Sequence, residues 1–257
     1  MNRSQMSGKE TDERLYERTS RDLKRGKFPG DFGVKLRMCN PKPGEKILDI
    51  GCGIGWFAGT VASQYGVEVL AIYASEYAIN EARKRYGNAN NLDFQVCDAL
   101  LIEYEEAFDK ILCLDVLEHF FYKDAQILLK KIHTALREGG SLVLCVPIND
   151  VWHLPAVRKL AKFLTIPTFE HKTFFGMQKV EAELKQAGFS IVELSPWFWL
   201  EDQLRIMLPH RIYSLSLIGK YFVGSVNIRA VKNSYAPSSL LGYDGETSNL
   251  VNTLVQR

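Results

Sequence analysis

Short apolar runs and amphipathic stretches alternate along residues 46–147 of this chain. Apolar runs bounded by glycine or polar residues are typical of strands that are buried on both faces. Such runs occur at 46–50, 67–75, 91–99, 108–119 and 141–146. Between them, residues 76–86 and 124–137 place apolar side chains at helical spacing. Strands that alternate with helices predict an α/β fold built on a doubly wound parallel sheet.

The same patterns of apolar and polar residues predict the elements in the later part of the chain. The helix expected over 124–137 should end at Gly139 and Gly140, and its apolar stripe is expected to lie in the core. That stripe consists of Ile127, Leu128, Ile132 and Leu136. A last helix is expected at 181–188, and two more strands at 189–194 and 221–231.

A glycine-rich turn follows the first predicted strand. Gly51, Gly53 and Gly55 stand between residues 47–50 and a helix, and glycine permits positive φ and a close approach of backbone to ligand. Backbone N–H groups at a helix start favour an anionic group. A dinucleotide site requires Gly or Ala at position 56, where this chain has Trp56, and no Gly-Lys-Ser/Thr follows the turn. The turn therefore predicts a small-molecule cofactor that is neither a dinucleotide nor a nucleoside triphosphate.

The motif Asp49-Ile50-Gly51-Cys52-Gly53-Ile54-Gly55 resembles the first motif of the class I S-adenosylmethionine (SAM) dependent methyltransferases, in particular their small-molecule type 11 group. Family segments match in order over residues 45–147, and more loosely over 170–232. The resemblance implies SAM as the cofactor and a Rossmann-like sheet of seven strands, mostly parallel, with an antiparallel last strand between the fifth and sixth. It also implies cofactor contacts from Asp49, Gly51, Cys52, Gly53 and Gly55.

The ends of the second and third strands supply further positions for the cofactor. The resemblance puts Tyr73 where an acid usually holds both ribose hydroxyls, and Asp98 with Ala99 beside the adenine. A phenol makes one hydrogen bond where a carboxylate accepts two. We expect SAM binding to be retained, either because Tyr73 still meets one ribose hydroxyl or because Glu76 substitutes for the acid. Weakened or altered cofactor binding is the alternative. The alternative for Asp98 is that it only caps the turn that follows.

The fourth strand leads to Asp115, Glu118 and His119. Open parallel sheets bind ligands outside the carboxyl ends of their strands, and the resemblance places Asp115 near the cofactor. Imidazole titrates near neutral pH and a carboxylate can orient it, so Glu118 and His119 are the candidate catalytic residues for taking a proton from an acceptor. The alternative is that this pair only fixes a loop.

The expected domain organisation has three parts. Residues 1–30 form a polar arm, 31–232 form the methyltransferase domain, and 233–257 form a mobile tail. Insertions at about 149–175 and 200–220 interrupt the alternation, and we expect them to form a lid over the substrate. Each carries a basic amphipathic segment, so contact with an anionic membrane surface is the alternative.

Composition narrows the class of protein. The chain has 257 residues, of which 46% are apolar, and a net charge of +2, so it can bury a large core and is not expected to bind nucleic acid. Its five cysteines are scattered without a Cys-x-x-Cys pair, which favours reduced thiols in a cytoplasmic protein. The five histidines show no metal-ligand spacing, so no metal is expected.

The pattern and the resemblance together predict a methyltransferase whose acceptor is a small molecule or is linked to lipid. Transfer is expected by direct displacement at the cofactor methyl, with an O, N or C atom as nucleophile. Trp152, Trp197, Phe198 and Trp199 suggest an apolar acceptor site, or are simply buried. Two alternatives stay open: a SAM-fold binding protein without catalysis, and a peripheral membrane protein that modifies a lipid-linked acceptor.

Overall fold

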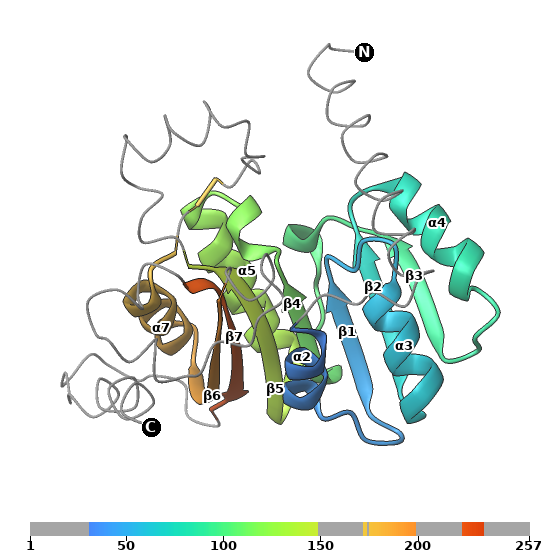
Figure 1. Cartoon of the computed structure of the whole chain (residues 1–257), viewed down its shortest axis with the longest axis horizontal. Coiled ribbons are helices and arrows are strands. Elements are labelled where there is room, and N and C mark those ends of the chain that lie inside the picture. The colour runs from blue at the N-terminus through green and yellow to red at the C-terminus, as the bar shows by residue number, and fades with distance from the viewer. Residues whose placement is uncertain (1–30, 149–171, 174, 199–222, 234–257) are drawn as a thin grey trace, which may run out of the picture.

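A twisted seven-stranded sheet forms the centre of the molecule (Figure 1). The computed structural model describes residues 31–148, 172–173, 175–198 and 223–233. The strands are β1 (Lys46–Ile50), β2 (Glu68–Tyr73), β3 (Leu92–Val96), β4 (Phe108–Leu114), β5 (Leu136–Pro147), β6 (Phe189–Phe198) and β7 (Val223–Lys232). They lie in the order β3-β2-β1-β4-β5-β7-β6. β1 to β5 pair in parallel and β7 is antiparallel to both β5 and β6, so the expected α/β fold and the place of its last strand are confirmed.

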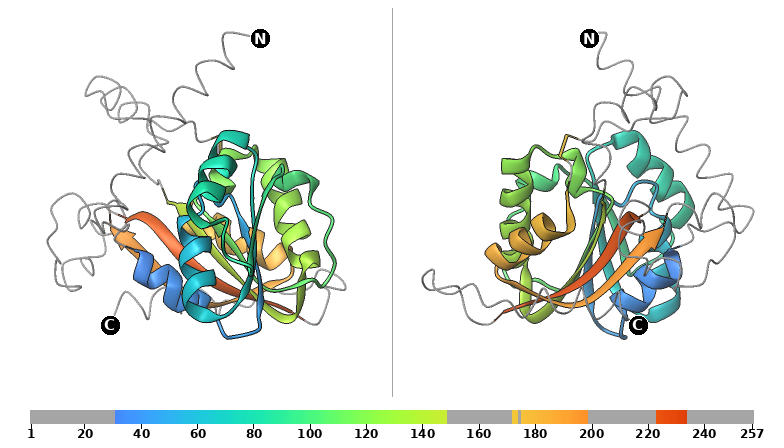
Figure 2. Two further views of the ribbon diagram at one scale, coloured as in Figure 1. Left: turned by 90° about the vertical axis from the view of Figure 1, so that its right-hand side faces the viewer. Right: turned by 60° about the vertical axis from the view of Figure 1, so that its left-hand side comes forward.

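Helices cover both faces of the sheet, which Figure 2 shows from two further directions. One layer consists of α2 (Phe32–Cys39), α3 (Trp56–Tyr65) and α4 (Glu76–Tyr86). The other consists of α5 (Tyr122–Ala135) and α7 (Met177–Gln186). Two short 3-10 turns, η1 (Ala99–Leu101) and η2 (Leu117–His119), follow β3 and β4. The helix α4 has the bounds that the sequence predicts, whereas α2 was not predicted.

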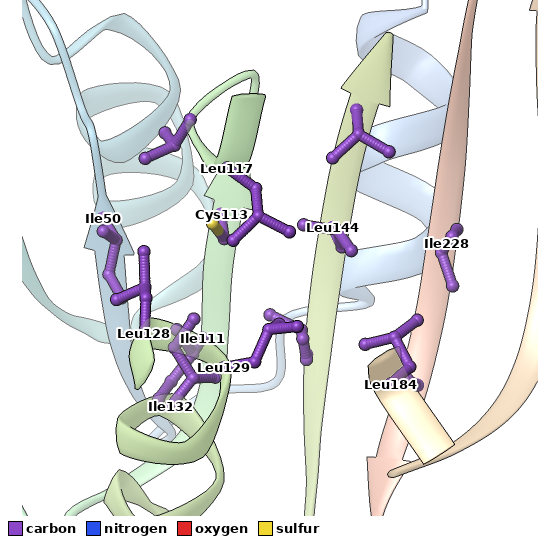
Figure 3. Packing of buried hydrophobic residues seen from close by; sticks show 14 of the residues in the cluster. Ile50, Ile111, Cys113, Leu117, Leu128, Leu129, Ile132, Leu144, Leu184 and Ile228 are labelled. Carbon is purple, nitrogen blue, oxygen red and sulfur yellow. The ribbon is translucent and has the colours of Figure 1, made fainter. Parts of the chain in front are cut away.

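Each central strand is buried on both faces because successive side chains point to opposite sides of the sheet. In β1, Leu48 and Ile50 join the core cluster under α5 and α7, while Ile47 joins the cluster under α2 and α3. Figure 3 shows the α5 side of this core, where Leu128 and Ile132 face the sheet. These contacts hold β1 and β4 in place at the centre of the fold.

The prediction for α5 was wrong in two details. Ile127 was expected in the core but is 47% exposed, because the buried face of the helix is centred on Leu128, Leu129 and Ile132. The helix also ends at Ala135 rather than at the glycine pair, and β5 begins with Leu136 paired to Phe108. Strand pairing with β4 overrides the local helical pattern there.

Several predicted segments lie outside the described residues. These are the N-terminal arm, the C-terminal tail from residue 234, and the two insertions apart from residues 172–173 and 175. Their roles as arm, tail and lid stay predictions. Among the residues with a described structure, no helix is long and apolar enough to cross a membrane.

The strand order creates a switch point between β1 and β4. From β1 the chain builds outward to β2 and β3 on one side, and then returns to place β4 on the other side. In open α/β sheets, ligands bind in the crevice outside the carboxyl ends of strands at such a point. The glycine turn follows β1 here, and Asp115 follows β4.

Candidate functional site

A cavity of about 320 Å³ lies at the switch point, a size typical of small-molecule sites. Four of the residues that the sequence predicts for the site line it: Asp49, Gly51, Cys52 and Asp115. Its other walls come from the start of α2, the start of α3, the end of β4 and the beginning of β7. The structure therefore brings together residues that lie far apart in the chain.

The glycine turn is held in place by its backbone and by its packing. The amides of Gly51 and Cys52 both donate to the carbonyl of Ile72, at 2.9 and 3.1 Å. Gly51 has φ +80°, and a Cβ added there would lie 2.2 Å from Cγ2 of Val116. Gly55 has φ +74°, and its added Cβ would lie 2.5 Å from the ring of Phe94. Glycine is thus required at both positions by conformation and by space.

Asp49 is the acid of the turn motif, and its side chain lies under the cavity. It is 3% exposed, and burial raises its pKa to about 7. Burial also raises the pKa of the neighbouring Cys52 thiol. The carboxyl of Asp49 therefore changes charge near neutral pH, where a cationic ligand would favour its ionised form.

Three charged side chains form a row along one wall of the cavity. Lys35 Nζ lies 3.0 Å from Asp31 Oδ2 and 3.0 Å from Asp115 Oδ2. The Cys145 thiol donates to Asp115 Oδ1 at 3.0 Å. Asp115 has φ +56°, an uncommon conformation for a residue other than glycine and one that recurs at functional sites.

The charged groups of this row keep one another in their ionised forms. Burial works to raise the pKa of Asp115, but the Lys35 ammonium and the Cys145 hydrogen bond hold it below its ordinary value. Burial likewise works to lower the pKa of Lys35, but Asp115, Cys145 and Asp31 raise it above the usual range. The sequence analysis missed Asp31 and Lys35. Their i,i+4 spacing is the only signal, and it is also the spacing of ordinary surface ion pairs.

Glu118 and His119 lie together on η2 but in different surroundings. Glu118 is 2% exposed, and burial, followed by the charge of Asp115, raises its pKa to about 8. Among the described residues, its Oε2 has no hydrogen-bond partner. Its backbone carbonyl accepts from the amides of Lys172 and Thr173, at 2.9 and 3.1 Å. His119 is exposed on the same turn, so the two candidate catalytic residues differ sharply in their contact with solvent.

The remaining predicted residues lie along the neighbouring strand ends and do not line this cavity. Tyr73 ends β2 and packs against Ile54 and Ala78. Asp98 is exposed and accepts a hydrogen bond from the Leu100 amide at 2.9 Å, which is the capping role given above as the alternative. Ala99 packs against the core. Contact of Tyr73, Asp98 and Ala99 with a nucleoside stays a prediction.

Comparison with known proteins reveals clear relatives. The family model for mycolic acid cyclopropane synthetase matches residues 30–198. An O-methyltransferase of Penicillium expansum is 31% identical over 169 residues, which cover 64% of this chain and 58% of the relative. An O-methyltransferase of Aspergillus sclerotiorum is 28% identical over 193 residues, covering 74% and 67%. The chain thus spans little more than half of the first of these relatives.

Solved structures share the fold at low sequence identity. A cyclopropane synthase of Mycobacterium tuberculosis superposes with a TM-score of 0.62 at 16% identity, covering 79% of this chain and 83% of that one. A metal site is not evident in the part of the chain that the structure describes, where no three His, Cys, Asp or Glu residues are grouped to hold an ion.

Proposed function

Because the chain belongs to the mycolic acid cyclopropane synthetase family of SAM-dependent methyltransferases, we propose that it transfers a methyl group from SAM to a small-molecule or lipid-linked acceptor. The observation that carries this proposal is the cavity at the end of β1 and β4. Among the described residues of its walls, three carboxyl groups, from Asp31, Asp49 and Asp115, accompany one ammonium group, from Lys35. That excess of acid suits a cofactor with a positively charged sulfur.

The residues present fit the cofactor, which is SAM. We propose that Asp49 and the turn of Gly51, Cys52, Gly53 and Gly55 hold its central part. Tyr73 would bind the ribose at the end of β2, which pairs with β1, and Asp98 and Ala99 would meet the adenine at the end of β3, which pairs with β2. When bound, SAM supplies a methyl group on a positively charged sulfur, which a nucleophile displaces directly.

The protein acts mainly by holding the two reactants in line and excluding water. The apolar side chains of Trp56, Phe57 and Leu114 face the cavity and support that role. Good alignment of two reactants contributes roughly 7–11 kcal/mol to lowering a barrier. Positioning therefore accounts for most of the rate enhancement that this site can supply.

We propose that Glu118 and His119 handle the acceptor proton. A carboxyl with a pKa of about 8 is a stronger base than an ordinary glutamate once it ionises, which suits work near neutral pH. His119 is exposed and within electrostatic reach of Asp115, so it can pass a proton to solvent. General-base help of this kind typically adds about two to four powers of ten in rate.

The test is transfer of labelled methyl from SAM by the full chain. The acceptor panel contains phenols, fatty acids and unsaturated phospholipids in anionic vesicles, and calorimetry with SAM and its demethylated product, S-adenosylhomocysteine (SAH), runs alongside. Label in one acceptor class supports the proposal. Binding of both ligands without transfer to any class would favour the non-catalytic alternative, and failure to co-sediment with the vesicles would remove the membrane alternative.

A second measurement tests the proposed role of Asp49. SAM and SAH differ by the positive charge on sulfur, and Asp49 gains its negative charge through about pH 7. The affinity of SAM relative to SAH is therefore expected to rise about three- to tenfold between about pH 6 and 8. In Asp49→Asn most of this rise should vanish, while an equal rise in both proteins would rule out Asp49 as its source.

A further inference from the structure

The short turn η2 carries Glu118 and depends on contacts from outside. Within it, the amides of His119 and Phe120 donate to the carbonyls of Val116 and Leu117, and no side chain among the described residues caps its start. Even so, the Glu118 side chain is 2% exposed and its Oε2 has no partner in the described part of the chain. An unpaired buried acceptor costs roughly 1–3 kcal/mol, so other contacts must keep this carboxyl out of water.

Lys172 and Thr173 supply contacts to this turn from a distant part of the chain. Both of their amides donate to the Glu118 carbonyl, at 2.9 and 3.1 Å. The Thr173 hydroxyl donates to the carbonyl of Phe120 at 2.7 Å, across 53 residues of sequence. The Lys172 ammonium lies 5.0 Å from the centre of the Phe121 ring, within the range of a cation–π contact. The contacts therefore run from Glu118, within the turn, to Phe121, at the start of α5.

Thr173 is itself fixed by the core of the protein. Its exposed fraction is 6%. Two residues later, Phe175 is 2% exposed, belongs to the core cluster under α5 and α7, and forms a parallel bridge with Ile148. The Ile148 amide in turn donates to the carbonyl of Gly224 at 3.1 Å. Because Thr173 is held between the core and a short turn, its hydrogen bonds decide where that turn lies.

The charged groups around Glu118 show why the place of its carboxyl matters. Burial raises the pKa of Glu118 to about 8, the charge of Asp115 raises it further in the same direction, and Lys35 works against both. The Cys113 thiol on β4 also interacts with the Glu118 charge, and His119 follows on the turn itself. Burial is the largest of these effects, so a turn that moved toward water would return the carboxyl toward its ordinary pKa.

We propose that Thr173 is a positioning residue for Glu118. Its amide and its hydroxyl hold the turn η2 so that the Glu118 carboxyl stays buried. This inference rests on the proposed function, in which Glu118 takes the acceptor proton. Thr173 acts only through the turn and is not itself a catalytic residue.

The test follows the titration of Glu118 by NMR, in full-length protein with isotope-labelled glutamate carboxyl carbons. Glu118→Gln identifies the signal, which should titrate near pH 8 in the wild type. Thr173→Val removes the hydroxyl donor and should lower this midpoint by at least about one pH unit, whereas Thr173→Ser keeps the donor and should stay near the wild type. An unmoved midpoint in Thr173→Val overturns the proposal, because a merely structural role lowers the free energy of unfolding without changing the titration.

Thr134→Val is the matched control. The Thr134 hydroxyl also donates to a backbone carbonyl, that of Lys130 at 3.2 Å, but Thr134 lies at the opposite end of α5 from η2. Its loss should leave the Glu118 midpoint unchanged. If Thr173→Val and Thr134→Val move the midpoint equally, the positioning role of Thr173 is refuted.

A measurement on the unmodified protein covers the case in which Thr173→Val does not fold. The amide signals of Lys172 and Thr173 should shift with pH at the Glu118 midpoint, since both amides donate to the Glu118 carbonyl, and Glu118→Gln should abolish that shift. Amide signals that do not respond to the ionisation of Glu118 would overturn the proposal. Equal methyl transfer by Glu118→Gln and wild type would instead refute the proposed role of Glu118 in the reaction, so the two failures are distinguishable.

Discussion

Gly51→Ala is expected to abolish SAH binding and to lower the free energy of unfolding by about 2–5 kcal/mol. The new Cβ would lie 2.2 Å from Cγ2 of Val116, and the residue would keep a φ of +80°. The left-handed backbone accounts for about 1–2 kcal/mol of this loss, and overpacking for the rest. Because relief of the collision moves the turn, the cavity wall moves with it. Urea denaturation and calorimetry with SAH measure the two effects.

The variant Gly44→Ala tests the effect of backbone strain without a steric collision. Gly44 has φ +82°, and a Cβ added there meets no atom within 4 Å. It should therefore lose only about 1–2 kcal/mol of stability and keep its affinity for SAH. Gly51→Ala combined with Val116→Ala removes the colliding methyl group and should recover part of the binding. If Gly51→Ala and Gly44→Ala lose the same stability and the same SAH affinity, the collision with Val116 does not cause the loss of binding.

Glu118→Gln is expected to remove much of the pH dependence of stability between about pH 5 and 8. In the folded protein, burial keeps Glu118 protonated up to about pH 8, whereas in the unfolded chain it ionises near pH 4.5. The folded state binds the extra proton over this window, so the wild-type protein becomes less stable as the pH rises. Each pH unit costs up to about 1.4 kcal/mol, and a total loss of about 2–4 kcal/mol is expected.

Urea denaturation at several pH values, for wild type and variant, checks this prediction. The stability of Glu118→Gln relative to wild type should increase with pH, while a residual slope from Asp49 remains below about pH 7. Glu68→Gln serves as the control, since Glu68 is an exposed residue at the start of β2. Equal slopes for the two variants would show that Glu118 does not hold a raised pKa.

Local sequence accounts for the architecture and for four of the ten described residues that line the cavity. The alternation of buried strands and amphipathic helices predicts the parallel sheet. The spacing of apolar side chains along a strand or helix, and hence which face is buried, can be recognised from residues that are close in sequence. Asp49, Gly51 and Asp115 meet at the cavity because parallel strands bring their carboxyl ends to one edge. Gly51 directly follows β1 and Asp115 directly follows β4, whereas Asp49 lies within β1.

Contacts between distant elements are the part that local pattern does not encode. The side chain of Asp98 caps its own turn by accepting a hydrogen bond from the Leu100 amide. An aspartate at that position can serve either as a cap or as a contact to a ligand. The end of α5 was misplaced because its last turn gives way to pairing of Leu136 with Phe108, which lies 28 residues earlier. The partner of Leu136 is therefore set by tertiary packing, whereas the hydrogen-bond partner of Asp98 lies only two residues along the chain.

The sequence by itself determined the glycine turn, the order of the strands and of the helices between them, and the family to which the chain belongs. Only the tertiary structure decided that Lys35 lies inside the site. An Asp–Lys pair four residues apart looks the same on a solvated helix as on a buried one, because helical spacing sets only which side chains are neighbours. Packing of α2 across β5 and β7 buries that pair, and the end of β4 supplies its second carboxylate.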